Sequence, residues 1–146
     1  MGLDQALRRM TPEIAAKLVK WMDSGSADAE GDLSDEEYNT IEDVWTGRKE
    51  NHIRRAIEQM KGMSAVNCGY LFLSREDVER LVGLLKEANA NHELAHTLLP
   101  TQSGFFFGST EYDEYYFEDI KRELADFEQV LNDWDEKSVY AYWEWW

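Results

Sequence analysis

The stretch GYLFLSREDVERLVGLLKEANAN, residues 69–91, joins a strand signal directly to a helix signal. Residues 69–73 form a short run of apolar, β-prone residues, which predicts a strand. Ser74 and Asp77 form a capping box, so a helix should begin there. The inward positions of this helix are Val78, Leu81, Val82 and Leu85. A strand and a helix this close together indicate an α+β fold.

Downstream of this unit, the sequence predicts two more strands and one long helix. SGFFFG, residues 103–108, is an aromatic run bracketed by glycines and is a strand candidate. Thr110 and Asp113 are expected to cap the long helix. Its apolar residues recur at three- and four-residue steps, at Tyr116, Ile120, Leu124, Phe127 and Leu131. VYAYWEWW, residues 139–146, predicts a further strand, although nearly every residue in it is large and apolar.

Upstream of residue 69, the sequence predicts only helices. A short helix is expected from about Leu3 to Met10. A second helix should follow Thr11, because Thr11 can cap it and Pro12 suits its first position.

A third helix is expected from Asp35 to Gly62. Ser34 and Glu37 form a capping box at its start, and Thr46–Gly47 can break or kink it. His52 falls among its apolar positions. Together these patterns predict an α+β fold, a mainly helical single domain with a small two- or three-stranded antiparallel sheet.

The charge of the chain limits its partners. The formal net charge is -15, from 30 acidic and 15 basic residues, and residues 100–146 alone hold 12 acids and 3 bases. Nucleic acid and anionic lipid would repel such a chain, because binding phosphates requires Lys and Arg. The favoured partner is a basic surface on a protein or ribonucleoprotein complex.

Cysteine content and the N-terminal sequence bear on the compartment. Cys68 is the single cysteine, so no internal disulfide can form and nothing argues for an oxidising compartment. The first residues lack a signal-peptide pattern, and no apolar run approaches the roughly 18 residues that span a bilayer. We therefore expect a soluble, cytoplasmic protein.

Three segments carry a resemblance to a known family. LPTQSGFFFGSTEYDEYYFEDI at residues 99–120, RKENHI at residues 48–53 and NCGYLFLSRED at residues 67–77 resemble a family of small proteins of tailed phages and prophages. The resemblance implies a phage context in a bacterial host cell and supplies no activity or ligand residues. The resemblance spans roughly residues 45–131, and we expect residues 45–146 to form an α+β core with an aromatic tail that lies outside the resemblance. Residues 1–44 are expected to be an acidic helical extension within one compact domain.

HELAH, residues 92–96, raises the possibility of a zinc hydrolase. Two histidines four residues apart on a helix, with a glutamate beside the first, could hold a metal-bound water and its general base. Asn89–Asn91 and Pro100 leave that helix barely two turns, and a third ligand is not identified by any motif. The alternative is a short surface helix in which Leu94, Leu98 and Leu99 pack inward. We expect no metal and no cofactor.

Two acidic clusters remain. Nine acids and no base lie between Asp23 and Asp43, and residues 111–136 hold 11 acids and 2 bases. If wholly helical, the second segment carries roughly one net charge per 4 Å, which approaches the one per about 3.4 Å of a single DNA strand. Glu118 can pair with Arg122, whereas Asp119, Glu123 and Asp126 form a like-charged stripe. The alternative is that both clusters are solvated faces that provide solubility.

The preferred hypothesis is a non-enzymatic phage protein that inhibits a host nucleic-acid-handling complex, such as a CRISPR or restriction complex, by nucleic-acid mimicry. Small acidic phage proteins often act in this way, so the step is an analogy of context. A zinc hydrolase and a phage assembly protein are the alternatives. A homodimer is left open, because exposed aromatic residues often anchor interfaces. The expected contact residues are Asp35, Glu36, Glu37, Glu42, Asp43, Glu118, Asp119, Glu123, Asp126, Asp133, Trp145 and Trp146.

Overall fold

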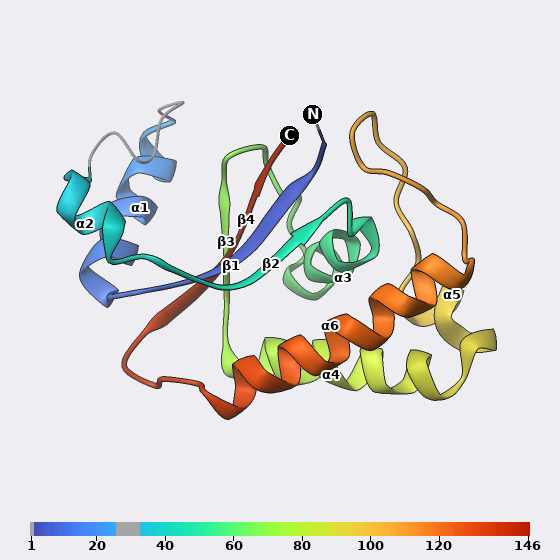
Figure 1. The fold of residues 1–146 in the computed structure, drawn as a ribbon. Helices are drawn as coiled ribbons and strands as arrows, with labels where there is room; N and C mark the ends of the chain where they lie inside the picture. The colour runs from blue at the N-terminus through green and yellow to red at the C-terminus, as the bar shows by residue number, and fades with distance from the viewer. Residues whose placement is uncertain (1, 26–32) are drawn as a thin grey trace.

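A four-stranded antiparallel sheet forms the centre of the protein in a computed structural model, which describes residues 2–25 and 33–146 (Figure 1). The strands are β1 (Asp4–Met10), β2 (Glu42–Arg48), β3 (Tyr70–Leu73) and β4 (Val139–Trp145), and their order is β2-β1-β4-β3. Each neighbouring pair is antiparallel. The predicted α+β class is confirmed, with four strands instead of two or three.

Helices cover both faces of this sheet. They are α1 (Pro12–Ser24), α2 (Asp35–Asn39), α3 (Asn51–Lys61), α4 (Arg75–Ala90), α5 (Ala95–Leu98) and α6 (Glu114–Asn132), with a 3-10 helix η2 (His92–Leu94) before α5. α3, α4 and α6 enclose the larger core cluster, whereas α1 packs on the opposite face. α4 and α6 lie side by side along the lower edge in Figure 1.

The composition of β4 follows from its place inside the sheet. Tyr140 and Tyr142 point into the larger core, and Ala141 and Trp143 belong to the cluster beneath α1. A strand with both faces covered needs no polar alternation, because neither face meets water. This explains why VYAYWEWW, correctly predicted as a strand, alternates so poorly.

The helix expected from Leu3 to Met10 is wrong, because these residues form β1. Leu3, Ala6, Leu7 and Met10 are all buried, at a spacing typical of a helix. In the sheet, however, Ala6 and Leu7 point to opposite faces that are both covered. β1 pairs with β2 on one side and with β4 on the other, so Asp4–Met10 lie inside the central sheet.

The helix expected from Asp35 to Gly62 is also wrong in its middle. The capping box of Ser34 and Glu37 is present, but α2 ends at Asn39 and the chain then forms β2. Pairing with β1 decides this outcome, because Val44, Trp45 and Thr46 are β-formers next to an open strand edge. The predicted break at Thr46–Gly47 is therefore part of a complete strand.

SGFFFG, residues 103–108, forms a loop and is not the expected strand. Phe107 is buried over Gly104, where a side chain would collide with its ring, while Phe105 is 93% exposed. The Phe107 N–H donates to the Gly104 carbonyl at 3.2 Å, which closes a local turn, and Gly108 follows it with a φ of 86°. α6 then begins at Glu114, with Asp113 as its N-cap in place of Thr110.

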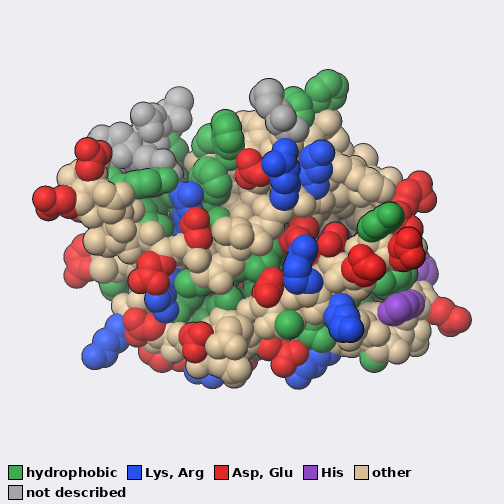
Figure 2. All heavy atoms as spheres, viewed as in Figure 1, with side chains coloured by type: hydrophobic (Ala, Val, Ile, Leu, Met, Phe, Trp, Pro, Cys, Tyr) green, Lys and Arg blue, Asp and Glu red, His purple; other side chains and the backbone are tan. Residues whose placement is uncertain are grey.

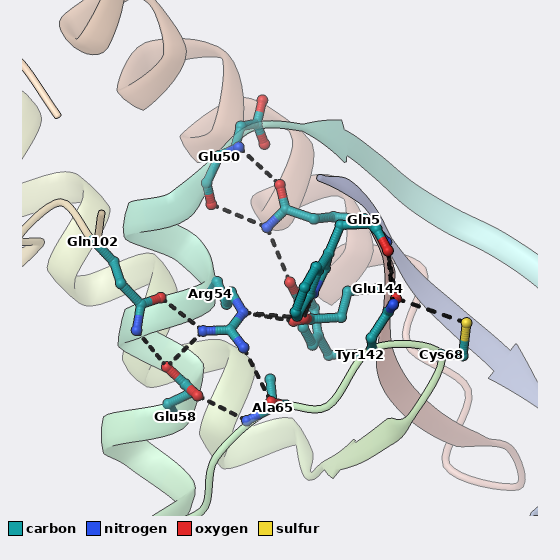
Figure 3. Close-up of polar contacts among 11 residues, drawn as sticks. Gln5, Glu50, Arg54, Glu58, Ala65, Cys68, Gln102, Tyr142 and Glu144 are labelled. Atoms are coloured by element: carbon teal, nitrogen blue, oxygen red, sulfur yellow. Dashed lines mark hydrogen bonds and ion pairs between the residues drawn. The ribbon is translucent and has the colours of Figure 1, made fainter. Parts of the chain in front are cut away.

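A buried polar network fixes α3 against the sheet (Figure 3). The Gln5 side chain donates to the Glu50 carbonyl and to the Tyr142 hydroxyl, both at 3.0 Å, and accepts from the Glu50 N–H. Arg54 donates to the Glu144 carboxylate at 2.8 Å and to the Ala65 carbonyl at 3.0 Å. Because the network joins β1, β4 and α3, it also fixes the residues just before α3.

Candidate functional site

A polar hollow lies where the start of α3 meets the start of α6. Its volume is about 280 Å³, and residues 48–52, 108–113 and 115–119 contribute its lining. The lining residues lie in two of the segments that carry the family resemblance, residues 48–53 and 99–120. Arg48 and Lys49 line it from the end of β2, and Asp113 and Asp119 line it from α6 and its cap.

His52 lies at the edge of this hollow and contacts Glu123 beneath it. Nε2 of His52 is 2.8 Å from both carboxylate oxygens, and the two residues are 3% and 0% exposed. The imidazole also packs on the Tyr116 ring, with 5.0 Å between ring centroids. Burial lowers the pKa of His52 to about 4, although the nearby Asp119 opposes that shift. Burial also raises the pKa of Glu123 well above its ordinary value, so the site favours the neutral form of both groups.

The burial of Glu123 corrects its predicted role in an exposed acidic stripe. Tyr116, Ile120, Glu123 and Phe127 follow one another at steps of three and four residues, so they share the inward face of α6. This spacing was the signal that could have identified Glu123. His52 is buried, as its apolar neighbours predicted, but its partner 71 residues away was not predictable from local pattern.

Arg122 binds different partners from the expected Glu118. Its guanidinium contacts the buried carboxylate of Glu50 and lies 3.4 Å from Asp119. Burial raises the pKa of Asp119, and Glu118 and Asp113 add to this effect by like-charge repulsion. Asp119 is therefore half-buried and paired, and is not a free surface charge.

Three of the six described acids between Asp23 and Asp43 are neutralised within the molecule. Glu37 lies 2.5 Å from Lys17, Asp43 lies 3.0 Å from Arg8, and Glu42 pairs with Arg9. Asp35 and Glu36 are exposed on α2 and have no ion pair within the described chain. The acids at positions 28, 30 and 32 lie outside the described residues.

The acids of α6 differ from one another in exposure, and several of them have no ion pair. Glu118 and Asp133 are exposed and Asp126 is half-buried, and none has an Arg or Lys partner among residues 2–25 and 33–146. Asp43 and Asp126 line one groove between β2 and α6, so the fold brings one member of each predicted cluster together. Basic side chains separate the acidic ones over the face shown in Figure 2. The two clusters thus adjoin without forming one uninterrupted acidic surface.

Trp145 and Trp146 lie apart from the α6 acids, at the end of the sheet near the N-terminus (Figure 1). Trp145 is 53% exposed. Trp146 is half-buried, and its N–H donates to the Asn67 side chain at 2.8 Å. Both rings line a cavity of about 260 Å³ beside Arg48.

The HELAH segment is a broken surface helix, formed by η2 and α5. His92 stacks on Phe117 with 3.9 Å between ring centroids, and His96 is exposed. Leu99 is buried as expected and Leu98 is half-buried, but Leu94 is 40% exposed, which corrects its predicted inward packing. No group of three or more His, Cys, Asp or Glu side chains in the described parts of the chain could hold a metal ion.

Comparison of the chain with protein-family models, with curated proteins and with solved structures finds no match. In residues 2–25 and 33–146, every helix is too short or too polar to cross a bilayer.

Proposed function

We propose that this is a non-enzymatic protein of a tailed phage or prophage that inhibits a host nucleic-acid-handling complex by binding its basic surface. The proposed contact surface is the α6 acidic face, defined as Glu114, Glu118, Asp126 and Asp133, with the exposed Tyr112 and Tyr115 beside it.

The observation that carries the proposal is that the acids of this face lack intramolecular cations. Glu114 and Glu118 are four residues apart and share one face of α6, and Asp126 and Asp133 lie within about a third of a turn of Glu114. Unpaired exposed carboxylates attract a basic partner over a longer range than carboxylates that already contact Arg or Lys. By the same reasoning, the paired acids Glu37, Glu42 and Asp43 contribute less.

Exposed tyrosines next to the acids support a protein partner. Tyr115 is 68% exposed and Tyr112 is 41% exposed. Tyrosine is among the residues that contribute most to binding at protein interfaces, because its ring buries a large area and its hydroxyl can still form a hydrogen bond.

Charge density limits how closely this face can imitate DNA. Its four acids span about 29 Å of helix, or roughly 7 Å per charge. One strand of DNA carries a charge every 3.4 Å or so. We therefore propose an acidic docking face for a basic protein surface and not a copy of each phosphate position.

The test is affinity capture from host lysate with two charge-matched variants. The first carries Glu114→Lys and Glu118→Lys on α6. The second carries Glu76→Lys and Glu87→Lys, two exposed acids without ion pairs on α4. We expect the wild type and the α4 variant to retain the same nucleic-acid-binding protein at low salt, and the α6 variant to lose it. Retention by the α6 variant, or capture unchanged at high salt, would rule the proposal out.

A further inference from the structure

The edge of the hollow offers an unused hydrogen-bonding group. His52 lines the hollow and is 3% exposed, and its Nε2 is occupied by Glu123. Its Nδ1 has no hydrogen-bond partner within the described residues. Because the site favours the neutral form of both groups, the Glu123 carboxyl donates to Nε2, and Nδ1 carries the ring proton, which it can donate to a ligand. A histidine that served packing alone would not need to open on a polar hollow.

One wall of the hollow is suited to an anion. α3 has 11 residues and begins without any side-chain cap, so its first backbone N–H groups and its dipole favour a negative group. Arg48 and Lys49 precede it and line the same hollow. Arg48 is 4.0 Å from Asp4, and Lys49 has no ion pair in the described chain.

The opposite wall carries carboxylates and a tyrosine. Asp113 accepts a hydrogen bond from the Tyr116 N–H, and Asp119 lies 3.4 Å from Arg122, so both already have partners. Glu111 is exposed and has no ion pair in the part of the chain that the structure describes. The Tyr115 ring is mostly exposed beside it. This wall can accept hydrogen bonds from an amino group and offers a ring for stacking.

We infer that the hollow binds a nucleoside monophosphate whose base carries an exocyclic amino group. Its phosphate would lie between Arg48, Lys49 and the start of α3, with a sugar or base atom at His52 Nδ1. The amino group would donate to Glu111, and the base would stack on Tyr115. A phosphate alone would leave the carboxylate wall unused, and a nucleoside alone would leave the cations unused. The inference shares Tyr115 with the proposed contact surface but uses none of the acids of the α6 acidic face.

Calorimetric titration of the full chain tests this inference with three probes. Guanosine 5′-monophosphate is expected to bind saturably, and more tightly than either guanosine or inorganic phosphate. Absence of saturable binding would overturn the inference. Binding of inorganic phosphate as tight as that of the nucleotide would overturn the nucleotide assignment.

Two matched variants test whether the nucleotide binds in the hollow. Lys49 has a φ of 57°, which asparagine tolerates, so Lys49→Asn removes the cation without straining the backbone. We expect about tenfold weaker nucleotide binding, as for loss of one hydrogen bond to a charged group. Lys86→Asn, at an exposed position of α4, should leave the affinity unchanged. Equal affinities of these two variants for the nucleotide would contradict the site.

Discussion

Glu123 and His52 show how burial changes the chemistry of single side chains. Burial lowers the pKa of His52 from 6.5 to about 4 and raises the pKa of Glu123 above 4.5. The unfolded chain takes up a proton on His52 as the pH falls from 6.5 to about 4, and the folded chain resists this uptake. The unfolded chain also releases the Glu123 proton above 4.5, whereas the folded chain retains it. The effect of His52 therefore lowers the free energy of unfolding as the pH falls, and the effect of Glu123 lowers it as the pH rises.

We predict that Glu123→Gln reduces the loss of stability at high pH. Glutamine can still contact His52 and has no proton to release, so the free energy of unfolding should decline less between about pH 5 and about pH 8 than in the wild type. Each proton contributes a slope of up to about 1.4 kcal/mol per pH unit. Urea unfolding followed by tryptophan fluorescence measures this slope. Glu87→Gln, on the exposed face of α4, should follow the wild type, and parallel curves for all three proteins would contradict the prediction.

A second prediction at the residue scale concerns the buried ion pair of Arg54 and Glu144. Arg54→Met leaves the fully buried Glu144 carboxylate without its guanidinium partner, which should lower the free energy of unfolding by about 3–5 kcal/mol. Replacing both residues with methionine removes both charges and should recover most of that loss. If the double variant is as unstable as the single variant, the cost arises from packing and not from the unpaired charge.

At the scale of elements, two helices begin with a capping box but differ in how much of the core they bury. Ser74 caps α4, which has 16 residues and buries Val78, Leu81 and Leu85 among others. Ser34 caps α2, which has five residues and buries none. A cap stabilises the protein only when its helix is coupled to the core, because a short exposed helix can fray without further loss.

We therefore predict different costs for two identical substitutions. Ser74→Ala should lower the free energy of unfolding by about 1 kcal/mol, the usual effect of losing an N-cap. Ser34→Ala should have a much smaller effect in the same chemical denaturation experiment. Equal losses would mean that α2 unfolds together with the core.

At the scale of the whole molecule, net charge opposes compactness. With a charge of -15, repulsion among carboxylates should lower stability at low ionic strength, where the screening length is long. We predict that the thermal midpoint rises when salt increases from about 0.02 M to about 0.2 M. The rise should be smaller in the variant that carries Glu114→Lys and Glu118→Lys, which has less net negative charge. A midpoint that falls with salt would mean that the internal ion pairs outweigh the repulsion.

The sequence by itself determined the features that act over a few residues. The caps of α1 and α4, the strands β3 and β4, the inward position of His52 and the α+β class follow from spacings that a local pattern contains. Caps and periodicity are short-range effects, so they hold whatever the rest of the chain does.

Only the tertiary structure decided which residues meet. Residues 3–10 have a helical spacing, yet they form a strand because two strands are available to pair with them. Glu123 contacts His52, which lies 71 residues earlier in the chain, and Arg8 neutralises Asp43 at a separation of 35 residues. Hydrogen bonds and ion pairs over such separations depend on the topology, which sums many weak preferences across the chain. For this reason the sequence shows where acidic residues are concentrated, but it could not show which of them remain without an ion pair.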